Sequence, residues 1–220
     1  MGKRFALEPL PLTVFMKIET VIDNIRHEID ALRGDEAKQK TYSSERTFPS
    51  ETAAEEAFTR SKEKLFAIKG WSGLSIFTAN FSLHDSTGNQ LVEQQPRVGD
   101  YIRIELPGPL PENWVQVIHV ANDDRSAEFT VKPSPNPQRN EEAAPEVAHF
   151  FQSQARSTFR VELAGDTINA SEIGQHEAIN NQDEQSGDRA LLNTLIAEAG
   201  WLFHQTIQWK ALTDYLVHID

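Results

Sequence analysis

Six large residues with polar tips stand within apolar stretches of the sequence, and their types are those that hold and orient small molecules. Small-molecule sites combine apolar walls with a few convergent polar groups, so these residues would form a site if the fold brought them together. Taken singly, an arginine with apolar neighbours is typical of an exposed strand, and a single tryptophan is typical of a core. The predicted ligand-binding residues are Arg103, Trp114, His119, Arg160, Trp201 and His204.

Two of these residues, His119 and His204, could act as general bases, because histidine exchanges protons near neutral pH. Neither has an acidic or nucleophilic partner in a recognisable motif, and Ser72 in "GWSGL" follows a helical pattern where a nucleophile elbow needs a strand. The histidines include no pair at i, i+4 and no metal-binding motif. The sequence therefore favours a non-enzymatic protein without a metal or other cofactor, with a cyclase- or hydratase-like enzyme as the alternative.

The acidic excess of the chain is confined to its larger part. Its 21 basic and 33 acidic residues divide into 12 and 12 over residues 1–70, which leaves 9 and 21 over residues 71–220. Such a field repels nucleic acid and anionic lipid, so neither is expected as a partner. The absence of a long apolar run and of a signal-peptide pattern predicts a soluble, cytoplasmic protein, and the lack of cysteine excludes disulfides and thiolate metal sites.

An amphipathic helix is predicted over residues 13–32, because its apolar positions recur every three or four residues. We place it in an N-terminal arm, residues 1–40, which precedes an α+β body, residues 41–220. The pattern is too short to argue for a coiled coil, so docking within the chain is favoured. The alternative is an interaction module, a homo-oligomer formed through Val14, Ile18, Val21, Ile25 and Ile29.

The body begins with a predicted strand over residues 42–48 and a helix from Thr52 to Lys69, with a Thr52–Glu55 capping box and Gly70 at the C′ position. A period of two then indicates consecutive strands joined by short turns, which is typical of an antiparallel meander. Phe81 and Leu83 are expected on one face of the first of these, with Ser82 and His84 on the other. This strand should form a hairpin with "LVEQQ" around Gly88, and further strands follow in "DYIRIELP", "NWVQVIHVA", "AEFTV", "STFRVEL" and "TINASEI".

Two later stretches complete the body. Prolines at alternate positions from Pro133 in "KPSPNPQRNEEAAPEVAHFF" favour polyproline II and predict an exposed loop. After Asp188 the sequence is helical, but its apolar stripe changes register: Trp209, with Leu212, Leu216 and Ile219, lies on a face rotated from the one that begins at Leu192. We therefore expect two helical segments that meet at a bend near residues 200–208, with His204 at the joint.

The element order of the body resembles the START and Bet v1-like helix-grip superfamily, which includes polyketide cyclases. The stretches that carry the resemblance are "TYSSERTF", "AEEAFTRSKEKLFAIKGWSGL", the strands from Ile76 to Ile173, and the helical tail after Asp188. The resemblance implies a curved sheet that grips the last helix around a cavity for an apolar small molecule. The expected protein is thus a non-enzymatic cytoplasmic domain that binds a small apolar ligand or has a structural role.

Overall fold

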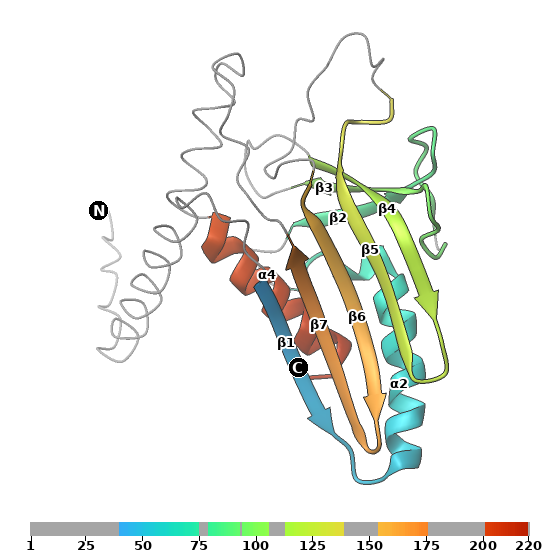
Figure 1. Cartoon of the computed structure of the whole chain (residues 1–220), viewed down its shortest axis with the longest axis vertical. Coiled ribbons are helices and arrows are strands. Elements are labelled where there is room, and N and C mark those ends of the chain that lie inside the picture. The colour runs from blue at the N-terminus through green and yellow to red at the C-terminus, as the bar shows by residue number, and fades with distance from the viewer. Residues whose placement is uncertain are drawn as a thin grey trace, which may run out of the picture.

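The computed structural model describes residues 40–74, 79–92, 94–105, 113–138, 154–175 and 201–219, and gives only the backbone for 201–207. The predicted N-terminal helix and its five interface residues lie outside the described residues. The described chain folds as one antiparallel sheet with two α-helices, α2 (Glu51–Phe66) and α4 (Trp201–Leu216), as the α+β prediction requires (Figure 1). No helix among the described residues is long and apolar enough to cross a membrane.

Seven strands form the sheet in the order β1-β7-β6-β5-β4-β3-β2. Strands β2 to β7 follow one another as the predicted meander, while the first strand returns to pair with the last. That pairing runs from Lys40 opposite Gly174 to Thr47 opposite Thr167. The strands are β1 (Lys40–Thr47), β2 (Asn80–His84), β3 (Tyr101–Glu105), β4 (Asn113–Asn122), β5 (Ser126–Ser134), β6 (Arg156–Ala164) and β7 (Thr167–Gln175).

Helix α2 begins and ends differently from the prediction. Its N-cap is Ser50, whose hydroxyl accepts from the Ala53 N–H at 3.2 Å, and Thr52 lies inside the first turn. At its other end the chain tightens into a 3₁₀ helix, η1 (Ile68–Trp71), so Gly70 is part of a turn and is not the C′ residue. The Trp71 indole Nε1 donates to the Lys64 carbonyl at 3.0 Å and thereby satisfies one of the carbonyls that a helix end leaves open.

Helix α4 runs without interruption from Trp201 to Leu216, so the predicted bend does not occur at residues 201–208. The predicted stripe is confirmed over Trp209, Leu212 and Leu216, which are all buried. Ile219 does not extend it, because the helix ends first and leaves this side chain 41% exposed.

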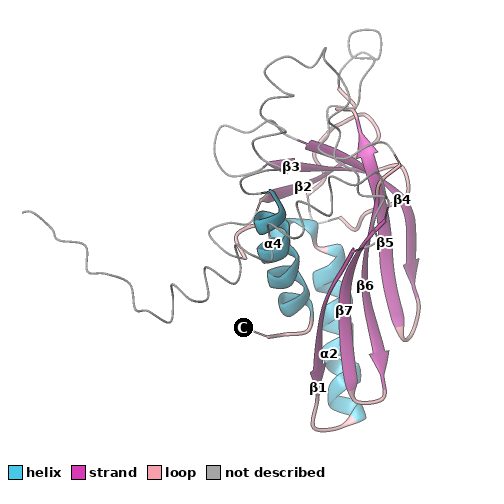
Figure 2. Cartoon of the chain, turned by 60° about the vertical axis from the view of Figure 1, so that its left-hand side comes forward, coloured by secondary structure: helices cyan, strands magenta, loops and turns pink. Residues whose placement is uncertain are grey.

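Both helices lie on the same side of the curved sheet (Figure 2). The space between them and the sheet is filled by side chains, including an aromatic cluster centred on Trp71. The ring centroid of Trp71 lies 4.8 Å from that of Phe159 and 5.6 Å from that of Phe129, and Phe159 lies 5.2 Å from Trp209. The described part of the interior is therefore packed, and a ligand would have to bind outside this cluster.

Two loop predictions are wrong in part. Pro133 belongs to β5 and pairs with Val115. A proline is tolerated at this position because no backbone N–H is needed there. Val117 directs its N–H and C=O toward β3, so a backbone N–H at position 133 would point away from β4 and toward β6, whose pairing with β5 ends at Val131. The "LVEQQ" stretch makes a bridge from Gln90 to His84 but no named strand among the described residues, and the strand paired with β2 is β3.

Candidate functional site

Four of the predicted ligand-binding residues lie on the outer face of the sheet, away from α2 and α4. Residues directly opposite each other on paired strands share a face. Trp114 is opposite Arg103, and their neighbours Val115 and Ile102 are the ones in the core. Arg160 is opposite Glu128, whose neighbour Phe129 is in the core. These four residues therefore do not line the interior, and a ligand-binding role for them stays a prediction.

A β-bulge explains how Trp114 and His119 come to share this face. Residues five apart in a regular strand point to opposite sides. The pairing of β4 with β5 shifts between Val117 and His119, so one extra residue is inserted and the later positions change sides. Trp201 and His204 lie in α4, and their side chains are outside the described residues.

His119 and Arg160 meet on the same carboxylate. His119 Nε2 lies 3.3 Å from Glu128 Oε1, and Arg160 Nε donates to Glu128 Oε2. His119 is 53% exposed on an open strand surface. Such surface ion pairs contribute little to stability and enclose no substrate. The predicted general base therefore does not face the interior, as the enzyme alternative would need.

A serine and a histidine that sequence reasoning passed over form a more promising arrangement on β2. Ser82 Oγ lies 2.9 Å from His84 Nε2, and His84 Nδ1 lies 3.0 Å from the Gly88 carbonyl oxygen. A carbonyl can only accept, so Nδ1 carries the ring proton and donates it to Gly88. Nε2 is then the acceptor of the Ser82 hydroxyl proton. This is the relation between a nucleophile, a base and the group that orients the base.

The turn after β2 fixes the position of the Gly88 carbonyl. Gly88 has a φ of +83°, as expected of the glycine at the tightest point of this turn. Asp85 accepts from the backbone N–H groups of Thr87 and Asn89 and from both of their side chains. These hydrogen bonds lower the pKa of Asp85 to about 2, and the bond from the Thr87 hydroxyl has the largest effect. Gln138 Nε2 also donates to the Gly88 carbonyl at 2.8 Å.

Two of the predicted residues surround this pair. Arg103 on β3 is directly opposite Ser82, and its guanidinium forms an ion pair with Glu105 at 2.8 Å. The Trp114 ring packs edge-on against His84, with ring centroids 4.8 Å apart, and His84 is only 7% exposed. The structure therefore brings Arg103 and Trp114 together at one place, beside a Ser–His pair. The strand alternation had placed Ser82 and His84 on one face, but only the Gly88 contact reveals an oriented base.

A pocket of about 340 Å³ adjoins the edge strand β2, and Ser82 is one of its lining residues. Its apolar side comes from the end of α2, from η1 and from the segment after the Gly88 turn. Its polar side chains include a lysine, a glutamate and several glutamines. The remaining lining residues are Glu63, Phe66, Ala67, Ile68, Lys69, Leu83, Gln90, Leu91, Val92, Gln94 and Gln95.

Among the described residues, side chains and turn residues occupy the free edge of β2. The Ser72 hydroxyl accepts from the Phe81 N–H at 2.9 Å and lies 3.4 Å from the Phe81 carbonyl oxygen. The Gln208 Oε1 accepts from the Ala79 N–H at 3.1 Å, and the Leu91 N–H donates to the Leu83 carbonyl at 2.8 Å. These contacts occupy backbone N–H and C=O groups at the edge and thereby oppose pairing with a strand of another chain. They also fix β2 relative to η1, and so shape the pocket.

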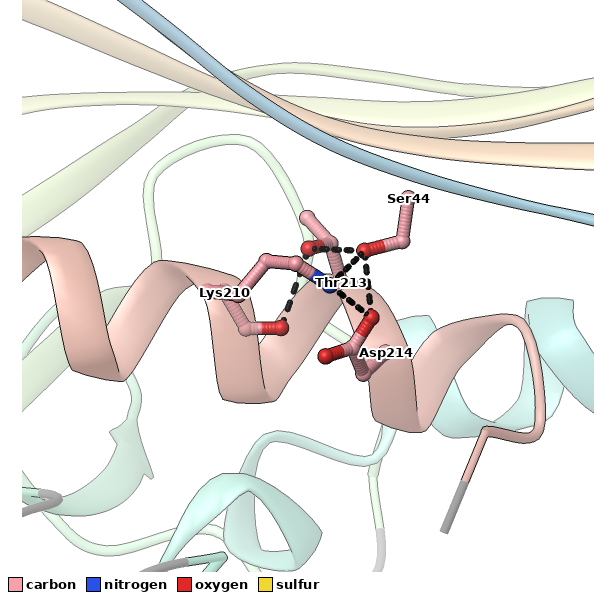
Figure 3. Close-up of polar contacts among 4 residues, drawn as sticks. All are labelled: Ser44, Lys210, Thr213 and Asp214. Carbon is pink, nitrogen blue, oxygen red and sulfur yellow. Dashed lines mark hydrogen bonds and ion pairs between the residues drawn. The ribbon is translucent and has the colours of Figure 1, made fainter. Parts of the chain in front are cut away.

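A second polar cluster joins β1 to α4 (Figure 3). Ser44 donates to Asp214 Oδ1 at 2.6 Å and accepts from Lys210 Nζ at 3.1 Å, while its oxygen lies 2.8 Å from the Thr213 hydroxyl oxygen. Lys210 also forms an ion pair with Asp214. An ammonium group that is paired with a carboxylate has no lone pair to accept the serine proton. We therefore interpret this Ser–Lys contact as a link between the sheet and the helix, without a catalytic role.

Replacing Ser44 with alanine should lower the free energy of unfolding by about 1 kcal/mol, because a single hydroxyl and its hydrogen bonds are lost while Lys210 and Asp214 keep each other. Urea denaturation followed by circular dichroism measures the change. Ser43→Ala is the matched control, since Ser43 is exposed on the same strand and should change stability by less than about 0.5 kcal/mol. Equal losses in the two variants would contradict the structural role of the cluster.

No protein-family model matches the sequence, and no curated protein matches it. Solved structures that are similar include a hypothetical protein from Helicobacter pylori, at 12% identity and a TM-score of 0.45, over 82% of this chain and 88% of that one. A norcoclaurine synthase point mutant from Thalictrum flavum is 13% identical over 84% and 98% of the two chains, with a TM-score of 0.40. The major latex-like protein 151 of Panax ginseng is 11% identical over 77% and 95%, with a TM-score of 0.36.

Likenesses this remote carry no functional argument. The class of the protein follows from its own elements: it is an α+β protein whose curved antiparallel sheet packs against a C-terminal helix, and this arrangement is consistent with a helix-grip fold.

Proposed function

We propose that the chain binds a small, mainly apolar molecule in the pocket beside β2. The observation that carries the proposal is the pocket itself, which at about 340 Å³ is within the size range of small-molecule sites. Phe66, Ile68 and Leu83 supply apolar walls, and the glutamine side chains supply amide donors and acceptors. A ligand with an apolar body and one or two polar groups suits this lining better than a multiply charged one.

The location of the pocket differs from the cavity that the sequence resemblance implies. That cavity would lie between the sheet and the last helix, where the described residues hold the aromatic cluster around Trp71. The β2 pocket instead lies at the edge of the sheet, against the end of α2. This is the reason why Trp209, though aromatic and buried, is assigned to the core and not to the ligand.

Two exposed valines provide a matched test of the pocket. Val92 lines it and is 62% exposed, whereas Val98 is 64% exposed and is not a lining residue. An aspartate at position 92 would place a charge against the apolar part of the ligand, which is unfavourable. The probe is N-(para-nitrophenyl)butanamide, an uncharged molecule with an aromatic ring and a short acyl chain, and its binding is measured by isothermal titration calorimetry.

Val92→Asp should weaken binding of the probe by at least about tenfold, which corresponds to about 1.4 kcal/mol. Val98→Asp should leave the dissociation constant within about twofold, because it adds the same charge outside the pocket. Both residues are exposed, so neither variant should unfold the protein. The same loss of affinity in both variants, or no binding to the unmodified protein, would refute the proposed site.

A further inference from the structure

We propose that Ser82 and His84 form a nucleophile–base pair that cleaves small carboxylic esters held in the β2 pocket. This inference rests on the proposed function, since it assigns chemistry to the same pocket. The chain would then be a hydrolase of uncharged esters with a short acyl group, with Ser82 as the nucleophile and His84 as the base.

The first support is the hydrogen-bond geometry. The Ser82 Oγ to His84 Nε2 distance of 2.9 Å falls within the range required for proton transfer from a nucleophile to its base. The Gly88 carbonyl fixes the tautomer that leaves Nε2 free to accept. A backbone carbonyl here occupies the role that a carboxylate has in a Ser–His–Asp triad. Because it is neutral, it stabilises an imidazolium less well, and slow turnover is expected.

The second support is that the base is held rigidly. His84 is nearly buried, its ring packs against Trp114, and its Nδ1 partner is set in a turn. That turn is closed by the Asp85 carboxylate, and Gln138 holds the Gly88 carbonyl from the other side. A base that is fixed in this way needs little reorganisation at the moment of reaction.

The third support is the position of the nucleophile. Ser82 is one of the pocket-lining residues of the edge strand β2; its side chain lies on the same face as Arg103, while Leu83 and Leu91 offer apolar contacts for an acyl chain. Arg103 lies opposite Ser82 on the neighbouring strand, where paired side chains have Cβ atoms about 5 Å apart. Its guanidinium would stabilise negative charge that develops on a carbonyl attacked by Ser82.

The reaction proceeds in two steps, acylation of Ser82 and hydrolysis of the acyl-serine. Ser82 Oγ attacks the ester carbonyl carbon while His84 Nε2 takes the hydroxyl proton; the carbon–oxygen bond to the alcohol then breaks, and His84 returns the proton to the departing alkoxide. Water next attacks the acyl-Ser82 ester, again losing its proton to His84. Cleavage of the bond to Ser82 releases the carboxylic acid, and the serine recovers its proton from His84. Ester and water give acid and alcohol, with no other reactant.

The test uses the full chain with para-nitrophenyl butyrate, the ester counterpart of the amide probe. Two readouts are combined: release of para-nitrophenol, and mass spectrometry of the peptide that contains residue 82 after acid quench. The unmodified protein should show a burst of para-nitrophenol and a butyryl adduct on Ser82. Ser82→Ala should remove the adduct, and His84→Asn should slow acylation by about 100-fold or more. Ser86→Ala, which removes an exposed hydroxyl from the adjacent turn, should change neither readout.

The amide probe separates failure of this inference from failure of the binding proposal. Binding of the amide that Val92→Asp weakens, together with no adduct on Ser82 in the unmodified protein, would overturn the Ser–His inference and leave the binding site intact. Hydrolysis that persists in Ser82→Ala would also overturn it. An adduct on Ser82 without measurable amide binding would overturn the pocket as the binding site. Binding of the amide by Ser82→Ala shows that the variant is folded, so loss of its adduct reports on chemistry.

Discussion

Replacing Trp71 with alanine should destabilise the protein by about 3–5 kcal/mol, the usual cost of removing a buried aromatic side chain. Trp71 is 1% exposed and packs against Phe81, Phe129 and Phe159, which come from three different strands. A cavity would remain, because strands held in one sheet cannot collapse around it. Domains are stable by only about 5–15 kcal/mol, so this single change would remove a large share of the total.

A milder substitution allows the effect to be measured even if Trp71→Ala does not fold. Trp71→Phe keeps an aromatic ring but removes the indole N–H that donates to the Lys64 carbonyl. It should lose about 1–3 kcal/mol, from the smaller ring and the lost hydrogen bond. Urea denaturation followed by far-ultraviolet circular dichroism measures both variants without relying on tryptophan fluorescence. Val98→Ala, at an exposed site, should stay within about 0.5 kcal/mol. A loss below about 1 kcal/mol for Trp71→Ala would show that this cluster is not the centre of the core.

The second large effect is expected at His218, which joins the end of α4 to α2. Its Nε2 lies 3.0 Å from the Ala57 carbonyl oxygen and 3.1 Å from Ser61 Oγ, and its Nδ1 lies 2.8 Å from Lys64 Nζ. The ring is therefore neutral, donating from Nε2 to the carbonyl and accepting at Nδ1 from the ammonium. Its φ of +62° is uncommon for a residue other than glycine, and these contacts hold it there.

Protonation of His218 opposes this arrangement. Burial is the main cause that lowers the pKa of His218; the Ala57 carbonyl partly opposes the shift, and the positive charges of Lys64, Arg60 and Arg46 add to it. With a folded pKa below that of the unfolded chain, the unfolded state takes up the proton first as the pH falls. The stabilisation is complete above about pH 6.5 and is lost progressively below it, with a slope of at most about 1.4 kcal/mol per pH unit from this one group.

The variant His218→Asn isolates this contribution, because asparagine tolerates positive φ and does not titrate. Between pH 7.5 and 5 the unmodified protein should lose more stability than the variant does. At pH 7.5 the variant itself should be less stable by about 1–2 kcal/mol, since the Ala57 carbonyl and Lys64 each lose one hydrogen bond. Val98→Ala is the control: Val98 is exposed and does not titrate, so this change should leave the pH dependence the same as in the unmodified protein. Parallel pH profiles for the His218 variant and the unmodified protein would contradict this role of His218.

Much of the local structure could be predicted from residue order alone. The alternation of Phe81 and Leu83 with Ser82 reflects the pleat of a single strand, and it placed the core-facing side chains of β2 correctly. The spacing of Ala54, Phe58 and Leu65 likewise identified the buried face of α2. These properties depend on neighbours along the chain, so no knowledge of partner strands is needed.

The candidate site was only partly accessible in the same way. Arg103 and Trp114 were singled out by residue type, and the structure places them beside the Ser–His pair. The pair itself was missed because a Ser-x-His spacing is common in strands that carry no chemistry. What distinguishes it is the Gly88 carbonyl behind His84, and that contact exists only once the turn has folded and Gln138, fifty residues further along, has closed against it.

The sequence by itself determined most of the described helices and strands and which of their residues alternate, because helical and strand periods are set by backbone geometry within each segment. Only the tertiary structure decided that β1 pairs with β7, that the bulge in β4 puts Trp114 and His119 on one face, and that aromatic side chains fill the described interior. These outcomes depend on contacts between residues far apart in the chain. Such contacts form only when the whole domain folds, and they produce no periodic pattern within any one segment.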